Sequence, residues 1–294
     1  MTAPVLLVVA HGSRDPRHAA TVHALVRAAA ALRPGVRVET AFLDFNVPSV
    51  PGVLDALAAE GVRDVIALPL LLTRAFHAKA DIPAVLRQAP PGLRVRQAEV
   101  LGPSPLLLRA LERRLYEAGL TPADMGSTGV VLASAGSTDP EANAVIATAP
   151  SRGTTPEPPA GTPEWRHAVE RMKRSTGVVL ASAGSTDPEA NAVIAETARE
   201  LRRAGWCAVR PAFASASLPR TEDAVRALRA DGVRRVAVAP YVIAPGRLPD
   251  RIAAGAADAD VLADVLGPAP ELARLLLARY DEARTPRTAA LAAV

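Results

Sequence analysis

The chain has 294 residues, 49% of them hydrophobic and 22% charged, which is enough for two ordinary domains with buried cores. It contains no apolar run of the roughly 18–20 uncharged residues that a membrane span needs, and its single cysteine, Cys207, excludes an intramolecular disulfide or a cysteine-based metal cluster. The net charge of +4 comes without a Lys/Arg tract and with only 3% aromatic residues, so we expect no nucleic-acid partner, no membrane and a cytoplasmic location.

Apolar runs of strand length alternate with helical patterns along the first part of the chain, which is typical of parallel βαβ units. Prolines and glycines punctuate the pattern and set the expected ends of its helices. The expected strands are Val5–Ala10, Val36–Leu43, Val62–Leu72 and Leu93–Leu101, and the expected helices are Pro16–Arg33, Pro48–Ala59, one that ends near Gln88, and Pro103–Glu117.

The same order of elements returns in the second part of the chain. GVRRVAVAPYVIAPG, from Gly232, matches GVRDVIALPLLLTRA, from Gly61, and VLADVLGPAP, from Val261, matches RQAEVLGPSP near the end of the first part. We therefore predict two similar doubly wound α/β domains with parallel sheets, in tandem and facing a shared cleft. The expected division is an N-terminal domain at 1–120, a linker at 121–175, a C-terminal domain at 176–284 and a tail at 285–294.

A second kind of repeat lies between the two predicted domains. Ser127–Ala147 is identical to Ser175–Ala195, so two copies compete for the first strand of the C-terminal domain. The later copy continues into a full amphipathic helix, whereas prolines end the helix of the earlier copy after about two turns, which is marginal in water. We expect the later copy to fill the core and the earlier copy to be an extra edge strand or loosely held. The Pro/Gly/Thr-rich stretch at 149–163 reads as a linker, with a short helix expected at 164–174.

The histidines are distributed unevenly between the two parts. There are five, and the second domain contains none of them. His11 follows the first expected strand and His77 lies in the loop after the third, so both project from the sheet edge where ligands bind. The first and third strands are neighbours in common doubly wound orders, so we expect the two imidazoles to converge on one site. Together they form a candidate site for a divalent metal, although two unrelated polar loop histidines remain the alternative. We expect His18 and His23 to be solvated.

Other polar residues lie near the same expected edge. Asp44 ends the second strand and is either a third ligand or proton acceptor, or a turn residue. Tight turns at helix starts bind anions through backbone N–H groups, and arginine can hold a carboxylate through two hydrogen bonds. For the charged residues the alternative is an exposed, solvated side chain. The candidate binding residues are Gly12, Ser13, Arg14, Arg74 and Lys79.

The segments AHGSRDP, near the N-terminus, and LPLLLTRAFHAKADIP, after the third strand, resemble the paired signature of class II chelatases. FLD at Phe42–Asp44 resembles a further segment of that family, and LASAGSTDP with APYVIAPGRLPDRI resembles the histidine-free half of its long, fused form. The resemblance covers nearly the whole chain except about residues 123–174. It implies a sirohydrochlorin cobaltochelatase or ferrochelatase, with His11 and His77 as metal ligands in a cleft closed by both domains.

The resemblance also implies a monomer in which the second histidine site has been lost. Short family members are understood to be symmetric dimers, so a fused chain needs only one site, and Ala183 and the segment around Leu248 mark the other. Fe²⁺ is favoured, with Co²⁺ a close second, and neither an organic cofactor nor ATP is implied. Some relatives have further histidines where this chain has Ala80 and Ser104, which affects proton handling and metal preference.

Three other functions remain open at this point. The first is a non-catalytic carrier of metal or tetrapyrrole that uses the same histidines, and the second is a pseudo-enzyme disabled by the duplicated insert. The third is a histidine phosphotransfer enzyme with His11 as nucleophile, which the Ala10 before it disfavours, because the phosphoglycerate mutase type has arginine there.

Overall fold

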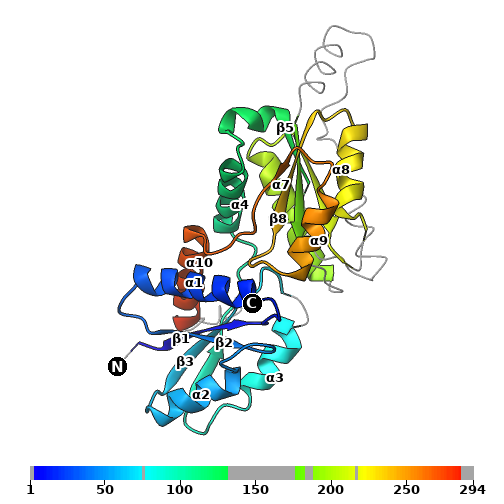
Figure 1. The fold of residues 1–294 in the computed structure, drawn as a ribbon. Coiled ribbons are helices and arrows are strands. Elements are labelled where there is room, and N and C mark those ends of the chain that lie inside the picture. Colours follow the sequence, from blue (N-terminus) through cyan, green and yellow to red (C-terminus); the bar gives the residue numbers. More distant parts are fainter. Residues whose placement is uncertain (1–2, 75–76, 132–175, 183–187, 216–217, 286–294) are drawn as a thin grey trace, which may run out of the picture.

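The computed structural model describes residues 3–74, 77–131, 176–182, 188–215 and 218–285. Two parallel sheets lie one above the other in Figure 1, each with helices on both faces. This confirms the predicted class of two similar α/β units in tandem. In the described part of the chain, no helix combines the length and apolar character that crossing a membrane requires.

The N-terminal sheet has the strand order β2-β1-β3-β4, so the first and third strands are neighbours as expected. Its strands are β1 (Val5–Ala10), β2 (Val38–Phe42), β3 (Asp64–Pro69) and β4 (Arg94–Gln97). The helices of this half are α1 (Pro16–Leu32), α2 (Val50–Ala59), α3 (Ile82–Leu86), which follows a π-helical turn at His77–Asp81, and α4 (Pro105–Glu117).

The C-terminal sheet has the order β7-β6-β5-β8-β9. Its strands are β5 (Thr128–Val131), β6 (Thr176–Ser182), β7 (Ala208–Phe213), β8 (Arg235–Tyr241) and β9 (Val261–Leu262). The helices of this half are α7 (Pro188–Arg203), α8 (Thr221–Ala230), α9 (Arg247–Gly255) and α10 (Pro270–Arg284), and a 3-10 helix, Pro122–Ser127, precedes β5.

The earlier copy of the duplicated segment does not form an edge strand, contrary to our expectation. Its strand β5 lies between β6 and β8 and pairs with both, whereas β6 pairs with β7 and, at Thr176 and Gly177, with β8. Two identical sequences have the same preference for the same buried position, so local propensity could not decide between them. The later copy does lead into the core, because α7 buries Ile194 and Leu201. The expected linker at 149–163 and helix at 164–174 lie outside the described residues.

The last helix of each half packs against the other half's sheet layers. In Figure 1, α10 lies beside α1 in the lower half and α4 lies near α7 in the upper half, and the contacts of α10 with α1 and β3 and of α4 with β8 and α7 agree. The hydroxyl of Tyr280, in α10, donates to the carbonyl of Pro4 at 2.6 Å. The halves therefore exchange their final helices.

Two arginines at equivalent places hold this exchange. Arg279 of α10 donates to the carbonyl oxygens of Val100, Leu101 and Pro103 at 2.8–3.1 Å. Arg114 of α4 donates from two nitrogens to the carbonyl of Leu266 at 2.8 and 3.2 Å. Each arginine thus binds the segment through which the chain crosses to the opposite half.

One hydrophobic core runs through both halves. It includes Leu25 of α1, Leu111 of α4, Leu201 of α7 and Leu276 of α10, all buried. Smaller clusters fill the outer faces, under α2 in the first half and under α8 and α9 in the second. Both halves contribute to this one close-packed core. The core therefore fixes the position of one sheet relative to the other.

Candidate functional site

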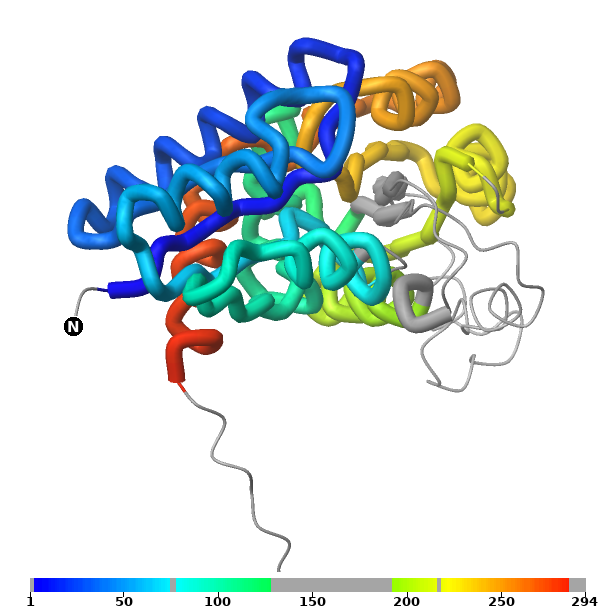
Figure 2. The backbone as a smooth tube through the Cα atoms, turned by 90° about the horizontal axis from the view of Figure 1, so that it is seen from below, coloured from blue at the N-terminus to red at the C-terminus, as the bar shows by residue number. Residues whose placement is uncertain are grey.

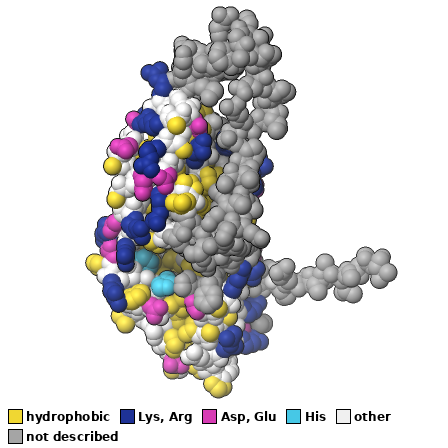
Figure 3. All heavy atoms as spheres, turned by 90° about the vertical axis from the view of Figure 1, so that its right-hand side faces the viewer, with side chains coloured by type: hydrophobic (Ala, Val, Ile, Leu, Met, Phe, Trp, Pro, Cys, Tyr) yellow, Lys and Arg dark blue, Asp and Glu magenta, His cyan; other side chains and the backbone are white. Residues whose placement is uncertain are grey.

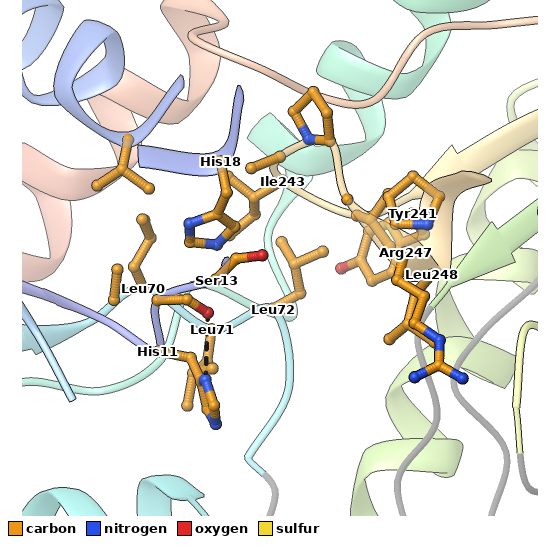
Figure 4. Close-up of a pocket in the computed structure, with 18 of the residues that line it drawn as sticks. His11, Ser13, His18, Leu70, Leu71, Leu72, Tyr241, Ile243, Arg247 and Leu248 are labelled. Atoms are coloured by element: carbon orange, nitrogen blue, oxygen red, sulfur yellow. Dashed lines mark hydrogen bonds between the residues drawn. The ribbon is translucent and has the colours of Figure 1, made fainter. Parts of the chain in front are cut away.

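A cleft of about 470 Å³ lies between the halves at the carboxyl ends of β1, β3 and β8. This is where open α/β sheets bind ligands. Figure 4 shows His11, Ser13 and His18 on one wall and Tyr241, Arg247 and Leu248 on the facing wall. The described lining residues are Ala10, His11, Gly12, Ser13, His18, Val22, Leu70, Leu71, Leu72, Thr73, Tyr241, Val242, Ile243, Ala244, Pro245, Gly246, Arg247, Leu248 and Pro249.

His11 is held at the cleft by the loop that follows β2. The backbone N–H of Asp44 donates to the carbonyl of His11 at 2.9 Å, and the N–H of Ser13 donates to the Oδ1 of Asn46 at 2.8 Å. Between these bonds lies Gly12, with φ of +97°, where a methyl group would collide with the carbonyl oxygen of Asp44. Only glycine fits this close approach, so the sequence HGS sets the position of the imidazole.

One neutral tautomer of the His11 ring fits both its hydrogen bond and metal binding. Its Nδ1 lies 3.3 Å from the carbonyl oxygen of Gly12. In the tautomer that donates this hydrogen bond, Nε2 carries the lone pair with which a neutral imidazole binds a metal. The ring of Phe45 stacks on His11 at 6.3 Å between centroids, and Phe45 has the positive φ of 62°, an unusual conformation for a bulky residue.

His18 is a cleft residue, which corrects our expectation that it is solvated. It lies in the first turns of α1, its side chain is half-buried, and its Nδ1 is buried without a hydrogen bond among the described residues. Burial is the main cause that lowers the pKa of His18, with the charge of His11 adding to it, so the ring favours its neutral form. His23 is partly exposed and packs edge-to-face on Phe42.

The other predicted site residues are divided between the cleft and its surroundings. Gly12 and Ser13 line the cleft, whereas Arg14, Arg74, Lys79 and Asp44 are exposed and are not among the described lining residues. The guanidinium of Arg14 lies over the ring of Phe45 at 5.0 Å, and Arg74 lies 3.9 Å from Glu99. The carboxylate of Asp44 stays a predicted ligand or base, while its backbone holds the His11 loop.

The side chain of His77 lies outside the described residues, so its pairing with His11 stays a prediction. Its backbone begins the π-helical turn at His77–Asp81, after the segment Leu70–Thr73 that lines the cleft. No group of three or more His, Cys, Asp or Glu side chains suited to a metal occurs within the described ranges.

The facing wall carries Tyr241 and Arg247, which the sequence did not single out, beside Leu248, which it assigned to the lost site. Tyr241, at the end of β8, is buried, and burial raises the pKa of its hydroxyl, which therefore stays protonated. Arg247 and Leu248 begin α9. Aligning Gly61–Thr73 with Gly232–Ala244 places Leu248 opposite His77 and Arg247 opposite Phe76 in the sequence. This alignment is the sequence signal that the side chains on the second wall differ from those on the first.

Ion pairing joins the two walls at the rim. Arg17, in α1, pairs with Asp15 at 2.6 Å and with Asp250, in α9, at 3.0 Å. Figure 2 shows the start of α1 next to α9. In Figure 3, histidine side chains are visible midway along the molecule, with Lys and Arg side chains around them. The cleft therefore combines an apolar interior, imidazoles on one side and a rim at which acidic and basic side chains pair.

The sequence matches the CbiX family over residues 5–118 and 177–283, which are the two halves without the segment between them. The chain belongs to the CbiX family. It is 33% identical over 144 residues to the sirohydrochlorin cobaltochelatase of Priestia megaterium, covering 47% of this chain and 46% of that protein. It is 30% identical over 139 residues to the sirohydrochlorin ferrochelatase of Bacillus subtilis, covering 46% of this chain and 52% of that protein. Each alignment thus spans about half of the relative.

Solved structures of the family share the fold of this CbiX chain over nearly its full length. SirB from Bacillus subtilis with Fe³⁺ has a TM-score of 0.69 and 21% identity, covering 96% of this chain and 95% of that one. The cobalt complex of the sirohydrochlorin chelatase SirB from Bacillus subtilis subspecies spizizenii has a TM-score of 0.66 and 19% identity, covering 97% of each chain. These matches show the two-unit α/β architecture independently of the sequence motifs.

Proposed function

We propose that this protein is a sirohydrochlorin chelatase, which inserts a divalent metal into a polycarboxylate tetrapyrrole on the way to sirohaem or cobalamin. The observation that carries the proposal is the cleft between the two halves, with His11 at the end of β1 and the loop toward His77 at the end of β3. The family and the named activities of its members in other organisms support it. Fe²⁺ is the favoured metal and Co²⁺ the second.

The reaction exchanges two protons for one metal ion: the two N–H protons of the ring leave as the divalent metal binds the four ring nitrogens. His11 and His77 hold the metal beside one face of the ring, and neutral imidazole suits both metals. The apolar segments Leu70–Leu72 and Val242–Ile243 cover the faces of the ring. The pyrrole protons pass to an imidazole of this wall or to Asp44.

The two walls also explain why one chain suffices. Both sides of the cleft come from the same polypeptide, and the exchanged helices α4 and α10 join the halves. We therefore expect a monomer with one metal site per chain, and no organic cofactor.

The test measures metal insertion by the full-length protein under anaerobic conditions. The absorbance of sirohydrochlorin is recorded over time after Fe²⁺ or Co²⁺ is added. We expect multiple turnovers that fall to the uncatalysed rate in His11→Ala and in His77→Ala. His23→Phe is the matched control, because it keeps an aromatic contact with Phe42 outside the cleft.

Two results would contradict the proposal. Tight binding of metal or tetrapyrrole without a rate above the uncatalysed reaction indicates a carrier or pseudo-enzyme. Turnover that survives both histidine substitutions indicates a different metal site. The relative rates with Fe²⁺ and Co²⁺ decide which metal the protein prefers.

A further inference from the structure

The cleft has one permanent charge on its described lining, and the histidine-free half supplies it. Of the described lining residues, only Arg247 is an Asp, Glu, Lys or Arg; the others are apolar, small, hydroxyl-bearing or imidazole side chains. A polycarboxylate ring that enters this apolar space must keep its carboxylates hydrated or pair them with a cation. Arg247 is the one described lining residue whose positive charge can pair with a carboxylate.

Arg247 is available for a ligand in this structure. Its side chain is exposed, and no described carboxylate forms an ion pair with it. The acidic residue in the first turn of the same helix, Asp250, pairs with Arg17 on the opposite wall instead. The guanidinium of Arg247 is therefore not neutralised within the described part of its own helix.

The backbone around Arg247 adds to its preference for an anion. Arg247 is the first residue of α9, and the N-cap, Gly246, provides no side-chain hydrogen bond to the first turn. The partial positive charge of a helix N-terminus thus lies beside a full positive charge. A Cβ built on Gly246 would lie 3.9 Å from the Oγ of Ser13, so the two walls converge here, close to His11.

Resting on the proposed function, we infer that Arg247 binds a peripheral carboxylate of the tetrapyrrole and so orients the ring over His11. A planar guanidinium pairs with a carboxylate through two parallel hydrogen bonds, which fixes direction as well as distance. In the other half, the equivalent sequence position before His77 is Phe76. The half that lost its histidine site therefore supplies substrate recognition to the half that kept it.

The experiment compares Arg247→Ala with Arg251→Ala in the full-length protein. Arg251 is also exposed, lies on the same helix and is not a lining residue, so it controls for the loss of one positive charge. For Arg247→Ala we expect the KM for sirohydrochlorin to rise about tenfold or more, with kcat within about twofold, because a charge-assisted pair is lost on binding. Arg247→Lys should recover part of the loss.

A binding measurement separates this inference from the proposed function. Quenching of porphyrin fluorescence gives the affinity for an octacarboxylate and for a tetracarboxylate porphyrin, without metal. We expect Arg247→Ala to weaken binding of the octacarboxylate ring and to reduce the preference over the tetracarboxylate ring, whereas Arg251→Ala changes neither.

The outcomes are distinct. Equal KM values and porphyrin affinities for Arg247→Ala and Arg251→Ala would overturn the role of Arg247 while leaving chelatase activity in place. A wild-type protein that binds the octacarboxylate porphyrin through Arg247 but never inserts metal would overturn the proposed function, and with it the orientation of a ring for insertion.

Discussion

The two halves share one fold and place corresponding segments at the same cleft, but the side chains on the two walls differ in kind. The N-terminal half presents His11 and His18, whereas the corresponding sequence positions in the C-terminal half are Ala183 and Ala190. The C-terminal half presents Tyr241 and Arg247 instead. A repeated backbone thus fixes where a site lies and leaves its chemistry to a few positions at the strand ends.

Alanine substitutions at the two cleft glycines, Gly12 and Gly246, should give the largest difference in stability between the two walls. At Gly12 a methyl group would collide with the carbonyl of Asp44, whereas at Gly246, also with positive φ, its nearest neighbour is the Oγ of Ser13 at 3.9 Å. We expect Gly12→Ala to lower the free energy of unfolding by about 4 kcal/mol, from strain plus overpacking, and Gly246→Ala by about 1–2 kcal/mol, from strain alone.

Urea denaturation of both variants measures this comparison. Gly35→Ala is a suitable reference, because nothing lies within 4 Å of a Cβ at that position. If both alanine variants lose a similar free energy of unfolding, the close approach of Gly12 to the carbonyl of Asp44 is not what constrains the His11 turn.

The exchanged helices provide the second comparison, between equivalent arginines of opposite halves. Arg279 binds three carbonyl oxygens and Arg114 binds one, and both side chains are largely buried at 16% and 17% exposure. We expect Arg279→Ala to destabilise by about 2.5 kcal/mol and Arg114→Ala by about 1.5 kcal/mol, because carbonyl groups lose a charged donor.

The control for the arginine variants is Arg33→Ala. Arg33 also joins the halves, through Asp281 at 2.6 Å, but both side chains of this pair are more than a third exposed, so a change of less than about 1 kcal/mol is expected. If all three variants lose the same amount in urea unfolding, the carbonyl contacts contribute nothing beyond surface charge.

The third and smallest effect concerns His18, whose counterpart in the other half is Ala190. Burial lowers the pKa of His18 below its ordinary value of 6.5, so the unfolded state binds its proton at a higher pH than the folded state. Its contribution to stability is present above pH 6.5 and is lost as the pH falls toward the folded pKa. We expect Tm to fall less between pH 7 and 5 in His18→Ala than in the wild type.

Differential scanning calorimetry across that pH range checks the prediction. The difference between the two curves isolates His18 from the other titrating groups. Parallel Tm curves would mean that the imidazole is as well hydrated in the folded protein as in the unfolded chain.

Sequence patterns predicted the α/β class, the neighbouring β1 and β3 and the place of His11, because hydrophobic periodicity and the HGS turn are local signals. The exchange of α4 and α10 was not predicted, because the apolar face of a helix does not specify which sheet it will cover. His18 was missed for a related reason: it lies seven positions after His11, and only the angle at which α1 leaves β1 brings both to the cleft. Arg247 was missed because an arginine in a sequence looks the same whether it is solvated or lines a cleft, and only the packing of the two halves brings it to this one.

The exchange of helices also has a consequence for the order in which the protein is made. The N-terminal sheet leaves the ribosome first, yet α10, which covers part of its inner face, is synthesised only after the strands of both sheets. Helix α1, whose Leu25 and Val26 belong to the shared core, therefore lacks its contacts with α10 until the strands of both sheets have been translated. For this protein, folding one half at a time during translation cannot go to completion, and the cleft forms only once both halves have been made.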